Sequence, residues 1–99
     1  MRGGEGEMAK ASAQMVLTNA VGLHARPSVK LTQLAKSFRA NVEFALAPEG
    51  PWTDAKSPVQ VMRVKAGKGS VIHVRAEGED AQAAVAALVD LVERKFDEE

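Results

Sequence analysis

The spacing of apolar residues constrains this chain of 99 residues more than any other feature, because it switches repeatedly between two periods. Apolar residues in alternate positions predict strands, and apolar residues spaced by three and four predict amphipathic helices. The expected elements are, in chain order, strand 14–18, helix 25–38, strand 41–46, strand 52–55, helix 58–65, strand 70–76 and helix 81–96. The order β-α-β-β-α-β-α predicts an α+β fold, with the helices on one face of a four-stranded, mainly antiparallel sheet.

The same pattern assigns a core face to each element. On the strands, the residues expected in the core are Met15, Leu17, Val42, Phe44, Leu46, Ile72, Val74 and Ala76. On the long helices they are Leu31, Leu34, Ala35, Phe38, Ala81, Ala84, Val85, Leu88, Val92 and Phe96. In the short helix, Val61 and Val64 share one side, and Val59 and Met62 share another. All four could pack inward, but so short a helix favours a core pair (Val61 and Val64) and an exposed pair (Val59 and Met62).

The N-terminus differs from the rest of the chain, because it is rich in glycine and charge. We expect residues 1–12 to form a flexible tail and residues 13–99 to form a single domain. The first eight residues lack the apolar core of a secretory signal, and no apolar run approaches the roughly 18 residues that a membrane helix needs. The chain has no cysteine for a disulfide or a thiolate metal site. We expect a monomeric, cytoplasmic protein without membrane insertion.

Charge and aromatic content argue against a nucleic-acid partner. Thirteen basic residues balance thirteen acidic ones, whereas nucleic-acid-binding domains usually carry a basic excess. The few aromatic residues offer no platform for stacking bases. Of the two histidines, His73 lies in mid-strand, and neither has carboxylates at a ligand spacing. We therefore expect no metal site and no cofactor.

His24 lies where a loop gives way to the first helix. The first backbone N–H groups of a helix have no internal acceptor, and together with the helix dipole they form an anion site. A phosphate on His24 could accept hydrogen bonds from the N–H groups of Ala25 and Arg26. The Arg26 side chain adds a permanent fork of donors for phosphate oxygens, and Pro27 stiffens the first turn. The alternative is an ordinary loop histidine beside a solvated arginine.

Three blocks of this sequence resemble the HPr family, the histidine-containing phosphocarrier proteins of the bacterial phosphotransferase system. The first is Gly22-Leu23-His24-Ala25-Arg26-Pro27, between the first strand and the first helix. The other two are residues 54–57, followed by Val61-Met62, and residues 76–80, which lead into the last helix. The resemblance covers roughly Met15 to Phe96 and implies the open-faced β-sandwich of the family.

The resemblance also implies a mechanism. Enzyme I, charged from phosphoenolpyruvate, would transfer its phosphoryl group to Nδ1 of His24, and Arg26 would stabilise the product. An enzyme II A-type component would then take the phosphoryl group, so the protein would be a carrier rather than a turnover enzyme. Two alternatives stay open. One is a specialised carrier of the nitrogen-regulatory branch or of dihydroxyacetone kinase, and the other is a regulatory binding module of the same fold that no longer transfers phosphate.

Ser57 has a structural and a regulatory interpretation. Serine is a preferred N-cap, and Pro58 suits the first helical position, so Ser57-Pro58 predicts the start of the short helix. The family resemblance implies that Ser57 is the position that a serine kinase phosphorylates in many members. The added negative charge could then block partner docking. Pro58 departs from the large aliphatic residue usual beside this serine.

The region around the short helix is expected to contact partners. Val59 and Met62 would supply an apolar patch near His24 in the family's fold. Arg63, Lys65 and Lys68 make the region basic, which either solvates it or favours acidic partner surfaces. Lys65 stands where the family often has glycine, and residues 47–54 form a longer segment than in compact members.

Overall fold

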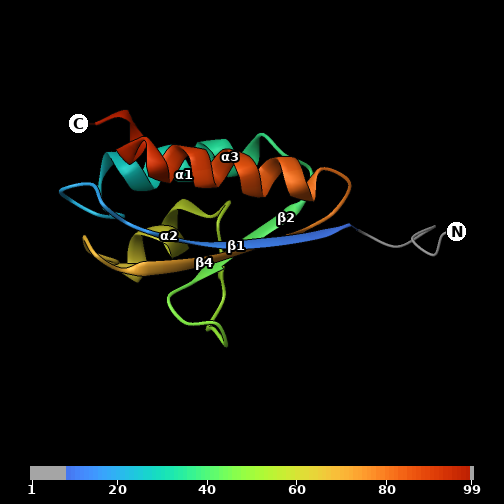
Figure 1. The fold of residues 1–99 in the computed structure, drawn as a ribbon, viewed down its shortest axis with the longest axis horizontal. Helices are drawn as coiled ribbons and strands as arrows, with labels where there is room; N and C mark the ends of the chain where they lie inside the picture. The colour runs from blue at the N-terminus through green and yellow to red at the C-terminus, as the bar shows by residue number, and fades with distance from the viewer. Residues whose placement is uncertain (1–8, 99) are drawn as a thin grey trace, which may run out of the picture.

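The computed structural model describes residues 9–98, and its helices and strands follow the expected order (Figure 1). Within those residues, no helix is long and apolar enough to cross a membrane. The elements are β1 (Lys10–Val16), α1 (Arg26–Lys36), β2 (Asn41–Ala45), β3 (Thr53–Asp54), α2 (Pro58–Val64), β4 (Val71–Glu77), α3 (Ala81–Glu93) and a final 3-10 turn (Lys95–Asp97).

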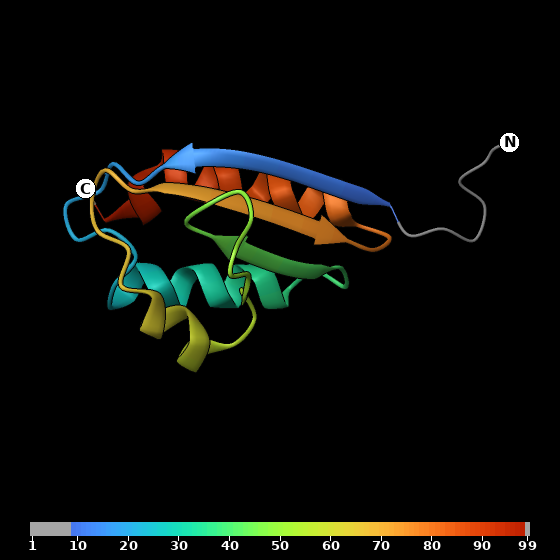
Figure 2. The ribbon, with the colours of Figure 1, turned by 90° about the horizontal axis from the view of Figure 1, so that it is seen from below.

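The sheet is antiparallel throughout, with strand order β1-β4-β2-β3. Met15 lies opposite Ile72, and Phe44 lies opposite Val74, so these apolar side chains share one face of the sheet. α3 packs against β1 and β4, while α1 and α2 pack against each other beside β2 and β3 (Figures 1 and 2). The predicted α+β sandwich, with its helices on one face, is confirmed.

The core lies between the helices and this apolar face. Met15, Phe44 and Val74 are each less than a tenth exposed, as their alternation predicted. Leu34 and Phe38 of the predicted helical stripe are only partly buried, at the margin of the core. On α2, Val61 is fully buried, whereas Met62 is 50% exposed, so the two sides of the short helix differ as expected.

The first strand begins earlier than the alternation predicted. Residues 10–12, which we expected in the flexible tail, pair with residues 75–77 of β4. Their apolar member is Ala11, which is too small to give a clear period-two signal, so the pairing with β4 defines this end of the strand. The part of the expected tail at residues 1–8 lies outside the described residues.

The expected core position of Leu46 is wrong. β2 ends at Ala45, and Leu46 is 45% exposed, while Ala45 is 2% exposed although its phase predicted the outer face. The following loop of residues 46–52 folds back beneath the open face of the sheet, where Trp52 stacks on Arg75 (Figure 1). Because this loop covers the end of the open face, the inward–outward alternation stops there.

The last helix is also shorter than predicted. Its stripe ends at Val92, and α3 ends at Glu93 rather than continuing to Phe96. Lys95, Phe96 and Asp97 instead adopt positive φ values of 57°, 58° and 59°. This left-handed turn carries the Phe96 side chain into the core, where it is fully buried. The predicted burial of Phe96 is therefore confirmed, although its predicted place on a continuous helix is wrong.

Candidate functional site

The loop between β1 and α1 presents His24 to solvent. The side chain of Leu23, directly before it, is fully buried. The Leu23 N–H donates to the carbonyl oxygen of Ala66 at 2.8 Å. The buried Asn19 amide donates from Nδ2 to the carbonyl of Gly22 at 2.8 Å. With its neighbours fixed in this way, the exposed His24 side chain lies on a well-anchored loop.

Gly22 is required by a close backbone approach. Its φ is +67°, in the left-handed region that favours glycine. A Cβ atom at this position would lie 2.5 Å from the carbonyl oxygen of Ala66 and 2.8 Å from the backbone of Gly67. The loop after α2 therefore supports the His24 loop from behind. Glycine is needed at this position of the motif because a larger residue would push the two loops apart.

The start of α1 leaves backbone donors free. The helix begins at Arg26, one residue later than predicted, and Ala25 precedes it with φ 53° and ψ −126°. The Ala25 carbonyl accepts from the N–H of Ser28 at 3.1 Å and from its hydroxyl at 2.6 Å. Among residues 9–98, however, the N–H groups of residues 24–26 meet no acceptor. Such groups at a helix start suit an anion.

Two cationic side chains, Arg26 and Lys30, share the carboxylate of Glu98 near these donors. Arg26 is 82% exposed, and the first turn of α1 carries no acidic residue. Its Nη1 lies 3.7 Å from a carboxylate oxygen of Glu98, and the other oxygen of Glu98 lies 2.6 Å from Nζ of Lys30. The hydrogen bond from Lys30 lowers the pKa of Glu98, and the charges of Lys30 and Arg26 act in the same direction.

α2 lies beside this site, because the chain that leaves it supports Gly22 and Leu23. Ser57 is the predicted N-cap of α2, and its hydroxyl accepts from the N–H of Gln60 at 3.3 Å. Val59 is 60% exposed and Met62 is 50% exposed, as the division of the short helix predicted. Lys65 ends α2 in the left-handed conformation, at the position where the resemblance led us to note a missing glycine.

Sequence reasoning missed three residues near His24. Val21 in the loop is 55% exposed, and Val29, one turn after Arg26, is 45% exposed. Val29 lies outside the apolar stripe of its helix, so its phase already carried this signal. Glu98 carried no signal, because only the left-handed turn at residues 95–97 returns it to α1. Together, Val21, Val29, Val59 and Met62 form an exposed set that we call the apolar rim.

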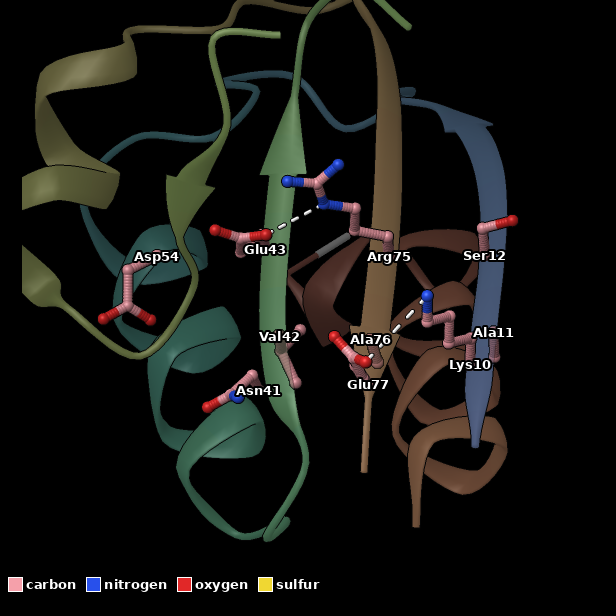
Figure 3. Close-up of a pocket in the computed structure, with 10 residues that line it drawn as sticks. All are labelled: Lys10, Ala11, Ser12, Asn41, Val42, Glu43, Asp54, Arg75, Ala76 and Glu77. Atoms are coloured by element: carbon pink, nitrogen blue, oxygen red, sulfur yellow. Dashed lines mark hydrogen bonds and ion pairs between the residues drawn. The ribbon is translucent and has the colours of Figure 1, made fainter. Parts of the chain in front are cut away.

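A pocket of about 820 Å³ lies elsewhere, on the open face of the sheet (Figure 3). Its charged side chains are largely matched with one another. Glu43 accepts from Arg75 at 2.8 Å, and Glu77 lies 4.0 Å from Lys10. Arg75 also lies 3.9 Å from the centre of the Trp52 ring. The pocket does not include His24 or Arg26, so the expected chemistry and this hollow are separate features.

Comparisons with known proteins agree with this geometry. The family model described as PTS HPr component phosphorylation site matches residues 11–94. The phosphocarrier protein HPr of Xylella fastidiosa (strain 9a5c) is 41% identical over 86 residues, covering 87% of this chain and 94% of the relative. The phosphocarrier protein NPr of Escherichia coli K12 is 36% identical over 83 residues, covering 84% of this chain and 91% of the relative.

Solved structures agree as well. HPr-C-His from Thermoanaerobacter tengcongensis superposes with a TM-score of 0.83 at 35% identity, covering 90% of this chain and 98% of that one. HPr from Bacillus anthracis superposes with a TM-score of 0.75 at 32% identity, covering 83% of this chain and 95% of that one. The chain therefore belongs to the HPr family of phosphocarrier proteins of the phosphotransferase system.

Proposed function

We propose that this protein is a cytoplasmic, monomeric carrier that accepts a phosphoryl group from Enzyme I on Nδ1 of His24 and passes it to an enzyme II A-type component. The observation that carries the proposal is the exposed His24 beside three backbone N–H groups that meet no acceptor within the described chain. Those donors supply what a phosphoryl group on the ring needs, namely hydrogen bonds to its oxygens.

The transfer conserves the number of protons on the ring and the total charge of Enzyme I and carrier, and the ring gains a formal positive charge that the phosphoryl group offsets. A neutral imidazole that holds its proton on Nε2 has a free electron pair on Nδ1. This pair forms the new N–P bond while the bond between phosphorus and the donor atom of Enzyme I breaks. The phosphoryl oxygens then face the N–H groups of residues 24–26, and Arg26 can turn from solvent toward them. The reverse sequence of bonds delivers the group to the next acceptor.

The exposed position suits a shuttle. A carrier must hold a charged group and yet present it to two different partners. Arg26 is 82% exposed, so its interaction with a phosphate is moderated by water. A deeply enclosed site would bind the phosphoryl group more tightly and would also exclude the acceptor. The exposed position therefore suits a group that must be handed between two partners.

The direct test replaces each histidine in turn. Incubation with phosphoenolpyruvate and a matched Enzyme I should add one acid-labile phosphate to the wild-type protein. His24→Ala should abolish this label, whereas His73→Ala, which changes a half-buried histidine of β4, should keep it. Mass spectrometry and ³¹P NMR measure the label and its position on the ring. Full labelling of the His24→Ala protein would refute the proposal.

The relatives also favour a second candidate, a carrier of the NPr type. The NPr proteins of E. coli K12 and Shewanella violacea are 36% and 35% identical to this chain, close to the 38–43% of the first HPr relatives. The two candidates share the chemistry at His24 and differ in their partners. Competition between a sugar-branch and a nitrogen-branch Enzyme I for the same carrier separates them, because the matched enzyme should phosphorylate it at the higher kcat/KM.

The apolar rim is the surface that we propose for both partners. Its members lie in the His24 loop, on α1 and on α2, two helices that contact each other, and Arg63, Lys65 and Lys68 lie on or just after α2. Apolar area of this kind supplies affinity, while the basic side chains raise the association rate with an acidic partner. Met62→Ala should raise the KM of Enzyme I for the carrier about three- to tenfold, within the range of single interface residues.

The matched control for Met62→Ala truncates an exposed apolar side chain outside the apolar rim. Leu46 is 45% exposed in the loop after β2, so Leu46→Ala also removes an exposed apolar side chain. Its KM should equal that of the wild type. An equal rise in both variants would show that the rim is not the docking surface.

For Ser57, we propose regulation by a serine kinase. Ser57 is half-buried at the start of α2, and Val59, two residues later, is exposed. A phosphate at this position adds nearly two negative charges next to the docking surface, which should repel an acidic partner. The test is phosphorylation by a serine kinase of an HPr-containing bacterium, followed by the Enzyme I assay. Unchanged transfer from the phosphoserine form would remove the regulatory role.

A further inference from the structure

Two hydroxyl groups lie on the buried side of α1. Ser28 is 1% exposed and Thr32 is 3% exposed, whereas most buried residues of the described core are apolar. The two residues are one turn apart, on the side of the helix that also buries Leu31 and Ala35. A buried hydroxyl costs free energy unless it finds a hydrogen-bond partner. The partners of these two hydroxyls therefore show what an apolar side chain could not supply here.

The two hydroxyls have acceptors in different places. Thr32 donates from Oγ1 to the carbonyl oxygen of Ser28 at 2.9 Å, which is a bond within the helix. Ser28 donates from Oγ to the carbonyl oxygen of Ala25 at 2.6 Å, and Ala25 precedes the helix. The same oxygen accepts from the backbone N–H groups of Ser28 at 3.1 Å and of Val29 at 3.3 Å. Ser28 thus makes the shortest of three bonds to the residue that follows His24.

These bonds orient one backbone donor of the phosphoryl site. The carbonyl of Ala25 and the N–H of Arg26 belong to one planar peptide group, in which they point in opposite directions. Ala25 has φ 53° and ψ −126°, so regular helix geometry does not determine the direction of this peptide. The hydrogen bonds to its carbonyl determine it instead. They turn the carbonyl inward and leave the Arg26 N–H facing outward, where it meets no acceptor in the described part of the chain.

We propose that Ser28 is a positioning residue for phosphoryl transfer, whose hydroxyl holds the peptide between Ala25 and Arg26 so that the Arg26 N–H can bind the phosphoryl group on His24. The proposal rests on the proposed function of His24. The hydroxyl has a second effect, because a hydrogen bond accepted by a carbonyl polarises the peptide and strengthens its N–H as a donor. Ser28 is buried, so it acts through this peptide.

A positioning role and a purely structural role have different consequences. The Arg26 N–H gains its acceptor only when His24 carries the phosphoryl group. Loss of the Ser28 hydroxyl should therefore weaken the phosphorylated form more than the free form, which shifts the equilibrium between them. A hydroxyl that only stabilises the helix would affect both forms equally. Thr32 supplies the comparison, because its hydroxyl is also buried and bonds a carbonyl inside α1.

The first experiment needs no Enzyme I. His24 is phosphorylated with phosphoramidate, a chemical donor, and the Arg26 amide proton is observed by NMR before and after. In the wild type, this proton should move downfield as it gains a charged acceptor. In Ser28→Ala the displacement should be smaller by about 10–30% from lost polarisation alone, and by more if the peptide turns. Thr32→Val should keep the wild-type displacement. An undiminished displacement in Ser28→Ala would overturn the proposal.

The second experiment uses the equilibrium with Enzyme I. Ser28→Ala should reduce the equilibrium ratio of phosphorylated to free carrier about two- to tenfold, the range of one hydrogen bond between neutral groups. Thr32→Val should leave the ratio unchanged. An equal reduction in both variants would overturn the positioning role, because it would trace the effect to the stability of α1. Alanine is a strong helix former, so Ser28→Ala should fold, and thermal unfolding of both variants checks this.

The two experiments also separate this inference from the proposed function. If Enzyme I fails to label His24 while chemical phosphorylation still moves the Arg26 amide in a way that depends on Ser28, the carrier function is wrong and the positioning role stands. If Enzyme I labels the wild type and Ser28→Ala changes neither the amide displacement nor the equilibrium ratio, the carrier function stands and the positioning role is wrong.

Discussion

Backbone N–H groups near the two ends of α1 are in opposite states. At its C-terminal side, the N–H groups of Arg39 and Ala40 donate to the two carboxylate oxygens of Asp80 at 2.9 and 2.8 Å. At its N-terminal side, those of residues 24–26 meet no acceptor among the residues described. One end already holds an anion of the chain itself, whereas the other end is open to an anion from outside.

The difference shows where function lies in this fold. Backbone donors that serve stability are matched within the chain, because an unmatched buried donor is costly. Donors that serve transfer must stay exposed and unmatched until the ligand arrives. The pocket on the open sheet face follows the first rule, since Glu43 and Arg75 satisfy each other. Free donors therefore identify the site better here than a hollow in the surface does.

The largest expected effects come from substitutions that disturb a close glycine contact near each end of α1. Gly22 approaches Ala66, and Gly78, with φ +146°, approaches Ala40, where a Cβ would lie 2.7 Å from the Cα. Gly22→Ala and Gly78→Ala should each lower the free energy of unfolding by about 2–4 kcal/mol, since both combine overlap with an unfavourable φ. Denaturant titration measures this loss.

Only one of the two substitutions should affect transfer. Gly22→Ala displaces the loop that carries His24, so the rate of phosphorylation should fall more than about tenfold. Gly78→Ala should keep the wild-type rate wherever the protein is folded. Gly69→Ala is the control for φ alone, because a Cβ there meets no atom within 4 Å. Equal rates for all three variants would show that the close approach at Gly22 does not position His24.

The next prediction compares two arginines, one near each end of α1. Arg26→Ala should reduce the equilibrium ratio of phosphorylated to free carrier roughly 10- to 100-fold, since a hydrogen bond to a charged group contributes about 1.5–3 kcal/mol. Arg39→Ala removes a side chain of similar exposure, 86%, whose partner is Glu79. Because the Asp80 end already holds its anion, Arg39→Ala should leave the ratio unchanged. Equal losses would contradict the assignment of Arg26.

The sequence predicted the helix start that carries His24 better than it predicted the long-range contacts made there. His24, Arg26 and the Ser57 cap follow from local rules of helix starts, which act over three or four residues. Glu98 was not predictable in this way, because it depends on a left-handed turn without glycine.

The role of Asp80 was equally hidden. Its acidity suited the start of the last helix, but its carboxylate instead bonds backbone groups about 40 residues away. Alternation likewise located the centres of the strands and failed at Leu46, where a loop rather than the period decides burial. Local patterns thus predicted the elements, and long-range packing decided their ends.

The smallest expected effect is on the pH dependence of stability, and it tests the Asp80 carboxylate that binds backbone N–H groups after α1. The backbone hydrogen bond from Arg39, followed in effect by that from Ala40, lowers the pKa of Asp80 below its ordinary value of 3.8. A carboxyl group whose pKa is lower in the folded state stabilises the fold above its unfolded pKa. This contribution is lost as the pH falls through the folded pKa.

Asp80→Asn should therefore unfold at a lower temperature than the wild type at about pH 7, and the two proteins should converge toward about pH 2. Convergence is expected because a protonated Asp80, like asparagine, keeps only one good acceptor oxygen. Glu79→Gln, a change at the exposed neighbour, should show no such pH dependence. Phosphorylation of His24 should be unaffected in both variants. A loss of phosphorylation in Asp80→Asn would mean that the two ends of α1 are coupled, and the contrast between a filled anion site and an open one would then fail.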